Sequence, residues 1–499
     1  MTSRVVSLSV VLLTVAGAVP AQTIPIQTVP LVPADQFDIF PSYTLAMGGV
    51  SIAVPDTLHD PFVNPAKGAR VRAARFFSSP TFYSVSRDAG AGRTLPLGAF
   101  APAGAWFGGL ALALQQVDAS RIASPFTGAP PPGVFATGVA DLGSAPQSHG
   151  NALAFALLGT TLPGSGVSLG GSVSWAKLRA LDGVDLLYPG STRVTQFGET
   201  LDARLGFLKE WEGDRSFEAI LLHERFRMTH DVTFLDTFWD PGTQQFFQSA
   251  RLERNRDFSK RWGMQLKYEL PVAASGWRIG WLATANRTSQ PNTPNTDLLN
   301  IPQDPGLSNA YELGVGVSRT SGPALFGMDV VYQPIWSTTW AQAGTPTATS
   351  TGGLIPVGGR TVENGFHFSN ALFRMGFSHE LVRSLTKTAA LQLGLAVRSV
   401  HYSLAQQDHV EVTTQRLEES WVEWTPTWGL SLRFPELELR YRGRVSHGTD
   451  RLVATPNQFI GVADQRPIGG FFFPQPTLPP TLDGVHVVTH QFSISLPLR

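Results

Sequence analysis

The chain of 499 residues contains no cysteine, which excludes disulfide bridges and thiolate metal sites. Charged residues are scarce as well, at 15% of the chain, compared with about a quarter in soluble domains. The formal net charge is zero, so no overall positive field favours nucleic acid as a partner. Such a scarcity of charge suits a protein whose outer wall faces lipid.

Long apolar runs are missing beyond the first residues. No later stretch approaches the roughly 18 apolar residues that a membrane-spanning helix needs. The early apolar run from Val5 to Val19 follows Arg4, and this pattern predicts a signal peptide over Met1 to Ala21. An uncleaved anchor is the alternative. An exported chain of this kind is periplasmic, secreted or an outer-membrane barrel.

Motifs of catalysis are also absent. The 11 histidines are scattered, with no HExxH and no ligand-spaced cluster. There is no GxxxxGK loop and no GxGxxG before a helix. We therefore expect no enzyme, no metal site and no cofactor, with serine chemistry on a barrel wall, as in outer-membrane phospholipases, as the alternative.

What the chain has in abundance is alternation of apolar and polar residues with a period of two. This period predicts strands with one apolar and one polar face. Clear examples are the segments 391–398, 428–434, 437–442, 262–269 and 326–332. A soluble sandwich also alternates, so the pattern alone does not choose between a sandwich and a membrane barrel.

Three further features favour the barrel. Short and long connections alternate, as periplasmic turns and extracellular loops do. Tryptophans gather near segment ends, as in interfacial girdles, and the chain ends on an alternating strand. Short turns are expected near Ala103-Gly104, Pro163-Gly164, Gly213-Asp214, Ala274 to Gly276, Ser321-Gly322, Leu385-Thr386 and Pro435-Glu436. Long loops are expected over roughly Val117 to His149, Asp231 to Arg256, Ser337 to Asn364 and Thr449 to Asp483.

The seven short turns would join seven hairpins, which makes 14 strands. One more strand at each end, Arg72 to Ser86 and Val485 to Leu498, makes 16. Since one hairpin can be false, we predict an all-β, transmembrane, antiparallel barrel of 14 to 16 strands. A barrel of that size has a lumen wide enough for water or a folded segment.

The stretch from Tyr43 to Ala69 breaks the alternation. It is rich in Gly, Pro and other turn formers, and on composition alone it could be a surface loop. Glycines allow its backbone to pass close to another surface, and Pro65 fixes a turn after Asn64. Its most characteristic residues are Met47, Gly48, Gly49, Asp56, Asn64, Pro65 and Ala66.

These residues resemble the N-terminal plug signature of FadL-type outer-membrane transporters, a superfamily that includes the related PorV-like barrels. The family pattern is a Met-Gly-Gly segment, an Ala-Val-x-Asp segment and then Asn-Pro-Ala-Gly. Here Lys67-Gly68 replaces the usual glycine and apolar residue, and Pro55 stands where a small residue is common. The resemblance implies an N-terminal plug, or hatch, inside a barrel that has 14 strands in the family.

The resemblance also implies a function, which is passive uptake of hydrophobic or amphipathic small molecules such as long-chain fatty acids or aromatic hydrocarbons. The plug would act as the gate. The alternative is a non-transporting, PorV-like barrel that anchors or hands on secreted proteins. A third interpretation is a soluble periplasmic sandwich or adhesin.

Three further groups of residues are candidate sites. Inward-facing arginines could hold a carboxylate or other anionic head group, because the guanidinium fork suits that geometry; they are Arg433, Arg440, Arg442 and Arg444. Paired glycines in a strand often mark a bulge, so Gly108 and Gly109 could form the side opening that the resembling family has in its third strand. A loop with three adjacent aromatic residues is a candidate capture site, at Phe471, Phe472 and Phe473.

We expect three regions: the signal peptide over residues 1–21, an extended segment and plug over 22–71, and an outer-membrane barrel over 72–499. The expected partners are outer-membrane lipid and a hydrophobic small-molecule ligand, with no nucleic acid. We expect a monomer in the outer membrane of a Gram-negative-type bacterium.

Overall fold

A computed structural model gives the fold of the chain. It describes residues 37, 39–86, 90–118, 148–182, 191–240, 242, 245–272, 275–290, 306–384, 387–448 and 485–498. The predicted signal peptide and the three phenylalanines at 471–473 lie outside the described residues. So do most of the predicted loop from Val117 to His149 and all of the loop from Thr449 to Asp483.

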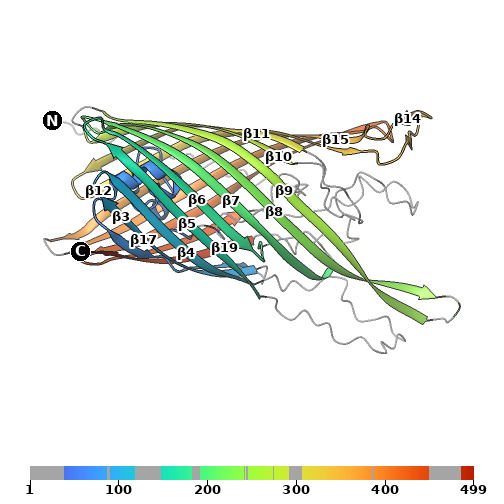
Figure 1. Cartoon of the computed structure of the whole chain (residues 1–499), viewed down its shortest axis with the longest axis horizontal. Coiled ribbons are helices and arrows are strands. Elements are labelled where there is room, and N and C mark those ends of the chain that lie inside the picture. The colour runs from blue at the N-terminus through green and yellow to red at the C-terminus, as the bar shows by residue number, and fades with distance from the viewer. Residues whose placement is uncertain are drawn as a thin grey trace, which may run out of the picture.

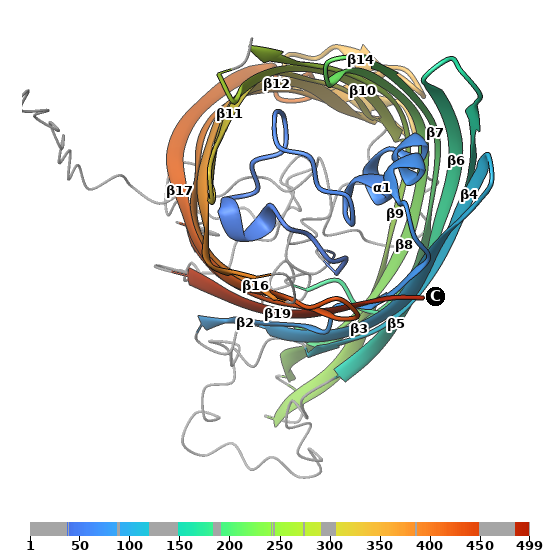
Figure 2. The same ribbon diagram turned by 90° about the vertical axis from the view of Figure 1, so that its left-hand side faces the viewer.

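The described strands form one closed antiparallel barrel (Figures 1 and 2). Its strands are β1 (Arg75–Ser78), β2 (Thr81–Val85), β3 (Gly90–Ala103), β4 (Trp106–Asp118), β5 (Ser148–Leu162), β6 (Val167–Leu178), β7 (Ser191–Trp211), β8 (Arg215–Asp240), β9 (Gln245–Val272), β10 (Trp277–Gln290), β11 (Gly306–Ser321), β12 (Ala324–Gln342), β15 (Arg360–Arg383), β16 (Thr388–Asp408), β17 (Thr413–Arg433), β18 (Glu438–Gly448) and β19 (Val485–Pro497). A separate hairpin joins β13 (Thr347–Ala348) to β14 (Leu354–Ile355).

The sheet has 17 strands, but β1 and β2 occupy a single position. Both pair with β3 on one side and β19 on the other, so the barrel has 16 positions. The interruption falls at Ser79-Pro80, because proline has no N–H to donate to the ladder. The predicted membrane barrel is thus confirmed, with 16 strand positions, the upper end of the predicted range. This is two more than the resembling family has, and the alternative of a soluble sandwich is wrong.

All seven predicted short turns join neighbouring strands, from the turn between β3 and β4 to the turn between β17 and β18. The predicted long loop from Asp231 to Arg256 is wrong. There β8 and β9 continue as a paired hairpin up to Asp240 and Gln245, and Figure 1 shows it extending beyond the neighbouring strands β6 and β7. This part of the hairpin has charged residues on both faces, so the alternation that identifies a membrane strand is missing although the backbone pairing continues.

The predicted loop from Ser337 to Asn364 is too wide for the same reason. Strand β12 runs to Gln342 and β15 begins at Arg360, with residues 341–342 marking a shift in their register. The β13–β14 hairpin fills most of the remaining connection. Backbone pairing therefore extends past the apolar part of the wall at several strands.

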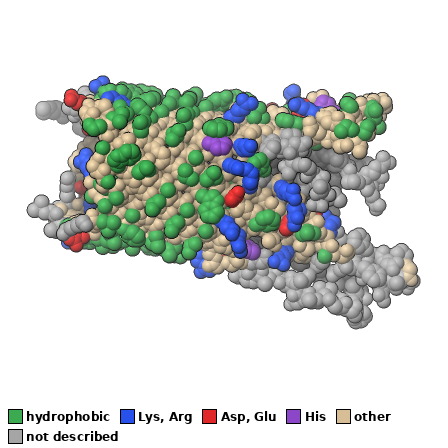
Figure 3. Space-filling model, in the orientation of Figure 1, with side chains coloured by type: hydrophobic (Ala, Val, Ile, Leu, Met, Phe, Trp, Pro, Cys, Tyr) green, Lys and Arg blue, Asp and Glu red, His purple; other side chains and the backbone are tan. Residues whose placement is uncertain are grey.

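The outer wall is apolar over the part of the barrel nearer the short turns. On β4, for example, Leu110, Leu112 and Leu114 are each more than 60% exposed. Figure 3 shows hydrophobic side chains covering this part, with Lys and Arg gathered beyond it towards the long hairpins. An apolar surface this large is stable only against lipid, so the barrel crosses a membrane.

In the part of the chain that the structure describes, helical structure is limited to three short pieces before the first strand. They are η1 (Leu45–Met47), α1 (Asp60–Val63) and η2 (Pro65–Arg70). Among the described residues, no helix has the length and hydropathy to span a membrane.

Candidate functional site inside the barrel

Residues 39–74, called the lumen segment below, lie inside the barrel. Figure 2 shows η1, α1 and η2 within the ring of strands, on the inner side of the barrel wall. Met47 and Ala66 are completely buried, and backbone atoms of both lie against glycines of the barrel wall. The wall of the barrel therefore supplies most of their environment.

The lumen segment crosses one row of paired residues on five neighbouring strands. This contact row consists of Ser318 on β11, Gly327 on β12, Gly376 on β15, Gly394 on β16 and Thr427 on β17. The Ser318 hydroxyl donates to the carbonyl of Ala53 at 2.7 Å. The Thr427 hydroxyl donates to the carbonyl of Ala46 at 3.0 Å and accepts from the amide of Gly48 at 2.9 Å.

Between these hydroxyls, glycines allow backbone to meet backbone. A Cβ at Gly376 would lie 2.2 Å from the carbonyl oxygen of Met47, and one at Gly394 would lie 2.0 Å from the amide nitrogen of Gly48. On the segment's side, Gly48 and Gly49 have φ of 72° and 75°, which side chains with a Cβ rarely adopt. The Met-Gly-Gly motif therefore packs closely against small residues of the wall.

Asp56 closes the lumen segment on itself. Its Oδ2 accepts from the Ser42 hydroxyl at 2.7 Å and from the amides of Tyr43 and Thr44. Its Oδ1 accepts from the amides of Leu58 and of the following residue, both at 3.3 Å. One carboxylate thus joins residues 42–44 to residues 58–59, which explains why the pattern places an acid here.

The Asn-Pro-Ala motif lies against a second pair of wall glycines. The side-chain oxygen of Asn64 accepts from the amide of Ala66 at 3.1 Å, which begins η2. A Cβ at Gly170 would lie 2.6 Å from the carbonyl carbon of Pro65, and one at Gly206 would lie 2.8 Å from the amide nitrogen of Ala66. The turn therefore fits directly against β6 and β7.

Lys67, which departs from the family pattern, is at the centre of a buried ionic cluster. Its ammonium lies 3.0 Å from Asp60 within the lumen segment and 2.8 Å from Glu218 on β8. On β9, Lys267 lies 2.6 Å from Glu269 and 3.9 Å from Glu218. Four of these side chains are no more than 6% exposed, and that of Asp60 is 14% exposed. Their opposite charges therefore stabilise one another where hydration by water is largely lost.

The charge of Lys67 is maintained by its neighbours. Burial alone lowers the pKa of this lysine, but the carboxylates of Asp60 and Glu218 outweigh burial and raise the pKa above its ordinary value. Lys67 is therefore a permanent cation inside the barrel.

Two further contacts fix the middle of the lumen segment. The carboxylate of Asp329 on β12 accepts from the amides of Ser51 at 2.7 Å and Ile52 at 3.3 Å. The ammonium of Lys267 donates to the carbonyl of Ser51 at 2.7 Å. The sequence analysis did not identify Asp329 or Glu218 as site residues. The available signal was an acid at an inward position of a strand, which by itself does not distinguish a contact with the segment from a contact with water.

The structure separates the arginines predicted to contact a head group, which are Arg433, Arg440, Arg442 and Arg444. Arg433 and Arg440 both bind Glu438, at 3.2 and 2.8 Å, close to the short turn before β18. The guanidinium of Arg440 also lies 5.4 Å from the ring of Tyr43. Arg442 and Arg444 lie further along β18, and Arg444 is paired with Thr427 of the contact row.

The predicted bulge at Gly108 and Gly109 is absent. Strand β4 pairs with β3 and β5 in unbroken register through both residues. A Cβ at Gly109 would lie 2.1 Å from the ring of Phe100, and Phe100 in turn contacts Phe62 of the lumen segment, with ring centroids 5.2 Å apart. Gly109 makes room for the Phe100 ring between the wall and the segment, and the unbroken pairing at both glycines does not support a side opening.

Two apolar clusters face the interior of the barrel. The segment cluster joins the lumen segment to β1, β3, β4 and β5 and contains Phe62, Val71, Phe77, Phe100, Phe107, Ala111, Phe155 and Leu157, with Phe40 packed against it. The loop-side cluster lies further along β6 and β8 and contains Ala176, Leu178, Leu181, Phe226, Met228, Val232 and Phe234, with Phe37 packed against it. Neither cluster was predicted from the sequence, because the alternation indicated polar residues on the inner face of the strands.

Comparison with known proteins gives matches by structure only. A Pseudomonas aeruginosa FadL homologue has a TM-score of 0.44 at 12% identity, over 92% of this chain and 99% of that chain. The Pseudomonas putida toluene transporter TodX has a TM-score of 0.39 at 11% identity, over 91% and 97%. A bacterial polysaccharide outer membrane secretin has a TM-score of 0.39 at 8% identity, over 86% and 99%. No family model and no curated protein matches the sequence.

Proposed function

We propose that this protein is an outer-membrane channel for passive uptake of hydrophobic or amphipathic small molecules, such as long-chain fatty acids or aromatic hydrocarbons. The observation that carries the proposal is the apolar surface inside the barrel. Channels that conduct water and ions are lined with polar side chains, whereas the loop-side and segment clusters offer an apolar molecule two successive sites. Binding there would be driven by burial of its apolar surface.

The start of the described chain connects the two clusters. Phe37 packs against the loop-side cluster, and Phe40 stacks on Phe62 with ring centroids 3.8 Å apart. A ligand moving from the loops towards the short turns would have to displace this aromatic contact. The lumen segment therefore fits the role of a plug that gates the path.

The contacts that hold the lumen segment suit a gate. Around Met47 and Gly48 its backbone meets the contact row through glycines and hydroxyl hydrogen bonds, whereas the charged groups of Asp329 and Lys267 hold Ser51 more strongly. The ionic cluster around Lys67 would hold the other end in place. Partial movement of residues 45–50, with residues 60–70 fixed, is the motion that we propose.

Arg442 and Arg444 are the residues that we propose for an anionic head group. They lie on β18 inside the lumen, beside the part of the segment that would move. Arginine binds carboxylates through two parallel hydrogen bonds. If they serve this purpose, R442Q/R444Q should lower uptake of oleate more than tenfold and leave uptake of toluene, which has no charge, unchanged.

The remaining expectations belong to the same proposal. Residues 1–21 would be removed on export, residues 22–71 would form the plug region, and residues 72–499 would form the barrel, which would act as a monomer without enzymatic activity. The amphipathic wall and the long hairpins at one end are consistent with insertion into the outer membrane of a Gram-negative-type bacterium.

The test is uptake of radiolabelled oleate and toluene by cells that express the protein, compared with cells that do not. L178N/F226N places two polar groups in the loop-side cluster, and we expect it to reduce uptake of both compounds at least tenfold. S446A alters an inward hydroxyl on β18, away from both clusters, and should have no effect. Retention of a heat-shifted band in the outer-membrane fraction checks that each variant forms a barrel.

Two outcomes would contradict the proposal. If the wild-type protein gave no uptake above the background of control cells, the PorV-like alternative, a barrel that anchors or hands on secreted proteins, would be favoured. If L178N/F226N transported both compounds at the wild-type rate, the apolar interior would not be the path.

A further inference from the structure

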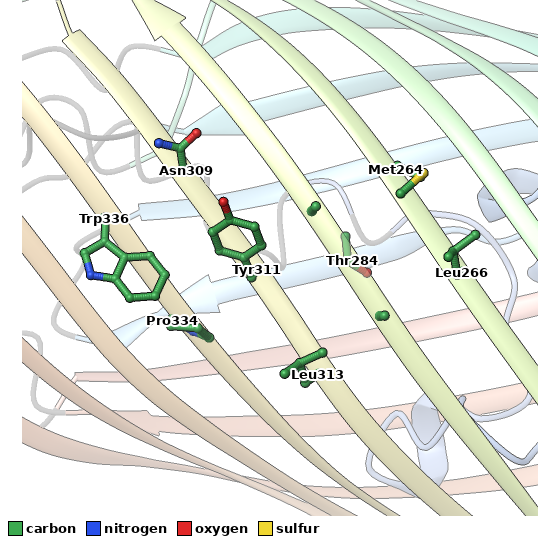
Figure 4. A pocket seen from close by; sticks show the side chains of 10 residues that line it. Met264, Leu266, Thr284, Asn309, Tyr311, Leu313, Pro334 and Trp336 are labelled. Carbon is green, nitrogen blue, oxygen red and sulfur yellow. The ribbon is translucent and has the colours of Figure 1, made fainter.

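A shallow trough lies on the outer wall across β9, β10, β11 and β12 (Figure 4). Its volume is about 660 Å³. The floor is formed by the small residues of β10, and large side chains of the neighbouring strands form the sides. The residues that matter here are Met264, Leu266, Ala283, Ala285, Tyr311 and Trp336. Met264 and Trp336 are 44% and 48% exposed, so the trough opens outward, away from the lumen.

The end of the trough nearer the long hairpins is basic. Arg287 follows Ala285 on the same outward face of β10, and it is paired with Trp262 on β9 and Asn309 on β11. Asn309 itself lines the trough. The outer surface of β10 thus changes from Ala285 to Arg287, which are successive outward-facing residues of the strand.

Next to Arg287 is a cluster of cations around one aromatic ring. Arg225, Arg227 and Lys260 lie 5.5, 5.0 and 5.6 Å from the ring centroid of Phe258. Arg225 and Lys260 are directly paired across β8 and β9. The same outward faces become apolar towards the short turns, at Leu221 on β8 and Met264 on β9, which are 56% and 44% exposed.

The cations of this surface are poorly balanced by acids. Glu199 on β7 lies 4.0 Å from Arg227, and both side chains are about half exposed. In the part of the chain that the structure describes, no carboxylate lies within 4.0 Å of Arg225, Lys260 or Arg287. Like charges held this close at the edge of a lipid layer repel one another, and a bound anion would remove that repulsion.

We propose that this face binds one phosphate-bearing lipid of the outer leaflet. Arg225, Lys260 and Arg287 would hold the phosphate, and one acyl chain would lie in the trough below. Arginine and lysine are the side chains best suited to phosphate, and the exposed ring of Trp262 beside them marks the level of the membrane interface. The adjoining apolar trough favours a lipid over free phosphate, because free phosphate gains nothing from it. The proposal is independent of transport.

The experiment measures lipid binding to the purified full-length protein in detergent by native mass spectrometry. The probes are diphosphoryl lipid A and the same lipid with its phosphates removed. The wild-type protein should bind the diphosphoryl form at least tenfold more tightly. Each cation near a membrane surface is worth about a fivefold change in affinity, so R225Q/K260Q/R287Q should lose roughly 100-fold for the diphosphoryl form and little for the other.

The matched control is R319Q. Arg319 also lies over an aromatic ring on the outer wall, 5.3 Å from the centroid of Trp277, but at the short-turn end of β11 and away from the trough. It should bind both lipids as the wild-type protein does. If the triple variant does not give a heat-shifted band, R287Q alone should still show about a fivefold loss.

A second variant tests the trough separately. A283F/A285F fills its floor without removing a charge, and binding of diphosphoryl lipid A should fall about tenfold. The proposal is overturned if both lipids bind the wild-type protein equally, or if R319Q loses as much affinity as the triple variant. It is also overturned if inorganic phosphate displaces the lipid at equal molar concentration, since the site would then be one for free phosphate.

Discussion

Lys67 stands where the resembling pattern has a glycine, and the structure gives a reason for the difference. Its ammonium joins Asp60 of the lumen segment to Glu218 of the wall, at 3.0 and 2.8 Å, with both Lys67 and Glu218 about 4% exposed or less. A lysine in a turn is usually a solvated surface residue. Here the closed barrel surrounds it, and it becomes the link between the segment and β8.

Replacing this lysine should loosen the segment more than the barrel. K67M removes the nearest cation of both carboxylates, while Arg70 and Lys267 remain, each 3.9 Å from one of them; breaking a buried pair in this way costs up to about 3–5 kcal/mol. We expect amide hydrogen exchange of residues 60–70 to accelerate in K67M while the strands keep their protection. R70M removes a cation that lies 3.1 Å from the half-exposed Glu210 and 3.9 Å from Asp60, so it should cost less than K67M; equal effects would contradict this assignment.

The dependence of this link on pH follows from the raised pKa of Lys67. A lysine whose pKa is raised on folding contributes its stability below the ordinary pKa of lysine and loses it only as the pH rises through the raised value. The link therefore acts with full strength at neutral pH and is lost only in strongly alkaline solution.

At the scale of the element, the strands β15, β16 and β17 show how a wall can accept a folded segment. Each contributes one small inward residue to the contact row, and the lumen segment approaches to backbone distance there. Glycine weakens a strand by leaving nothing to pack. At Gly376 and Gly394 this cost is offset because backbone atoms of Met47 and Gly48 fill the space.

A side chain added to this row should displace the segment and spare the strand. The Cβ of G394V would lie 2.0 Å from the amide nitrogen of Gly48, and valine is favoured in strands. We expect faster hydrogen exchange at residues 45–50 and an unchanged heat-shifted band. The control is G365V on β15, where a Cβ would meet one atom at 3.8 Å; if it had the same effect, the contact row would not be the cause.

At the scale of the whole molecule, the absence of cysteine makes the movement of the lumen segment directly testable. A Cβ at Gly327 would lie 3.4 Å from the Cβ of Val50, close to the separation found in disulfides. In V50C/G327C, oxidation should fix the segment to β12 and reduce uptake of oleate at least tenfold, and a reductant should restore it. The single variant V50C should be insensitive to oxidant, and uptake that survives cross-linking would rule out movement of this part of the segment.

The sequence by itself determined the class of the fold and most of its wall. Alternation along each strand and the seven short turns are local properties, and they were sufficient to predict an antiparallel membrane barrel. The motif residues from Met47 to Ala66 could likewise be recognised from their order alone. What could not be predicted locally was the length of the hairpin formed by β8 and β9, because backbone pairing there continues where the apolar face ends.

Only the tertiary structure decided which inward residues meet. The contact row joins residues 318–427 to a segment near residue 50. Lys67 likewise meets Glu218, which lies far from it in the sequence. Such contacts depend on the register of many strands and on closure of the barrel, and a period-two pattern is the same whether or not the partners coincide. The structure also showed that Arg433 and Arg440 bind Glu438. Closure of the barrel assembled two apolar clusters in a lumen where the alternation had indicated polar residues.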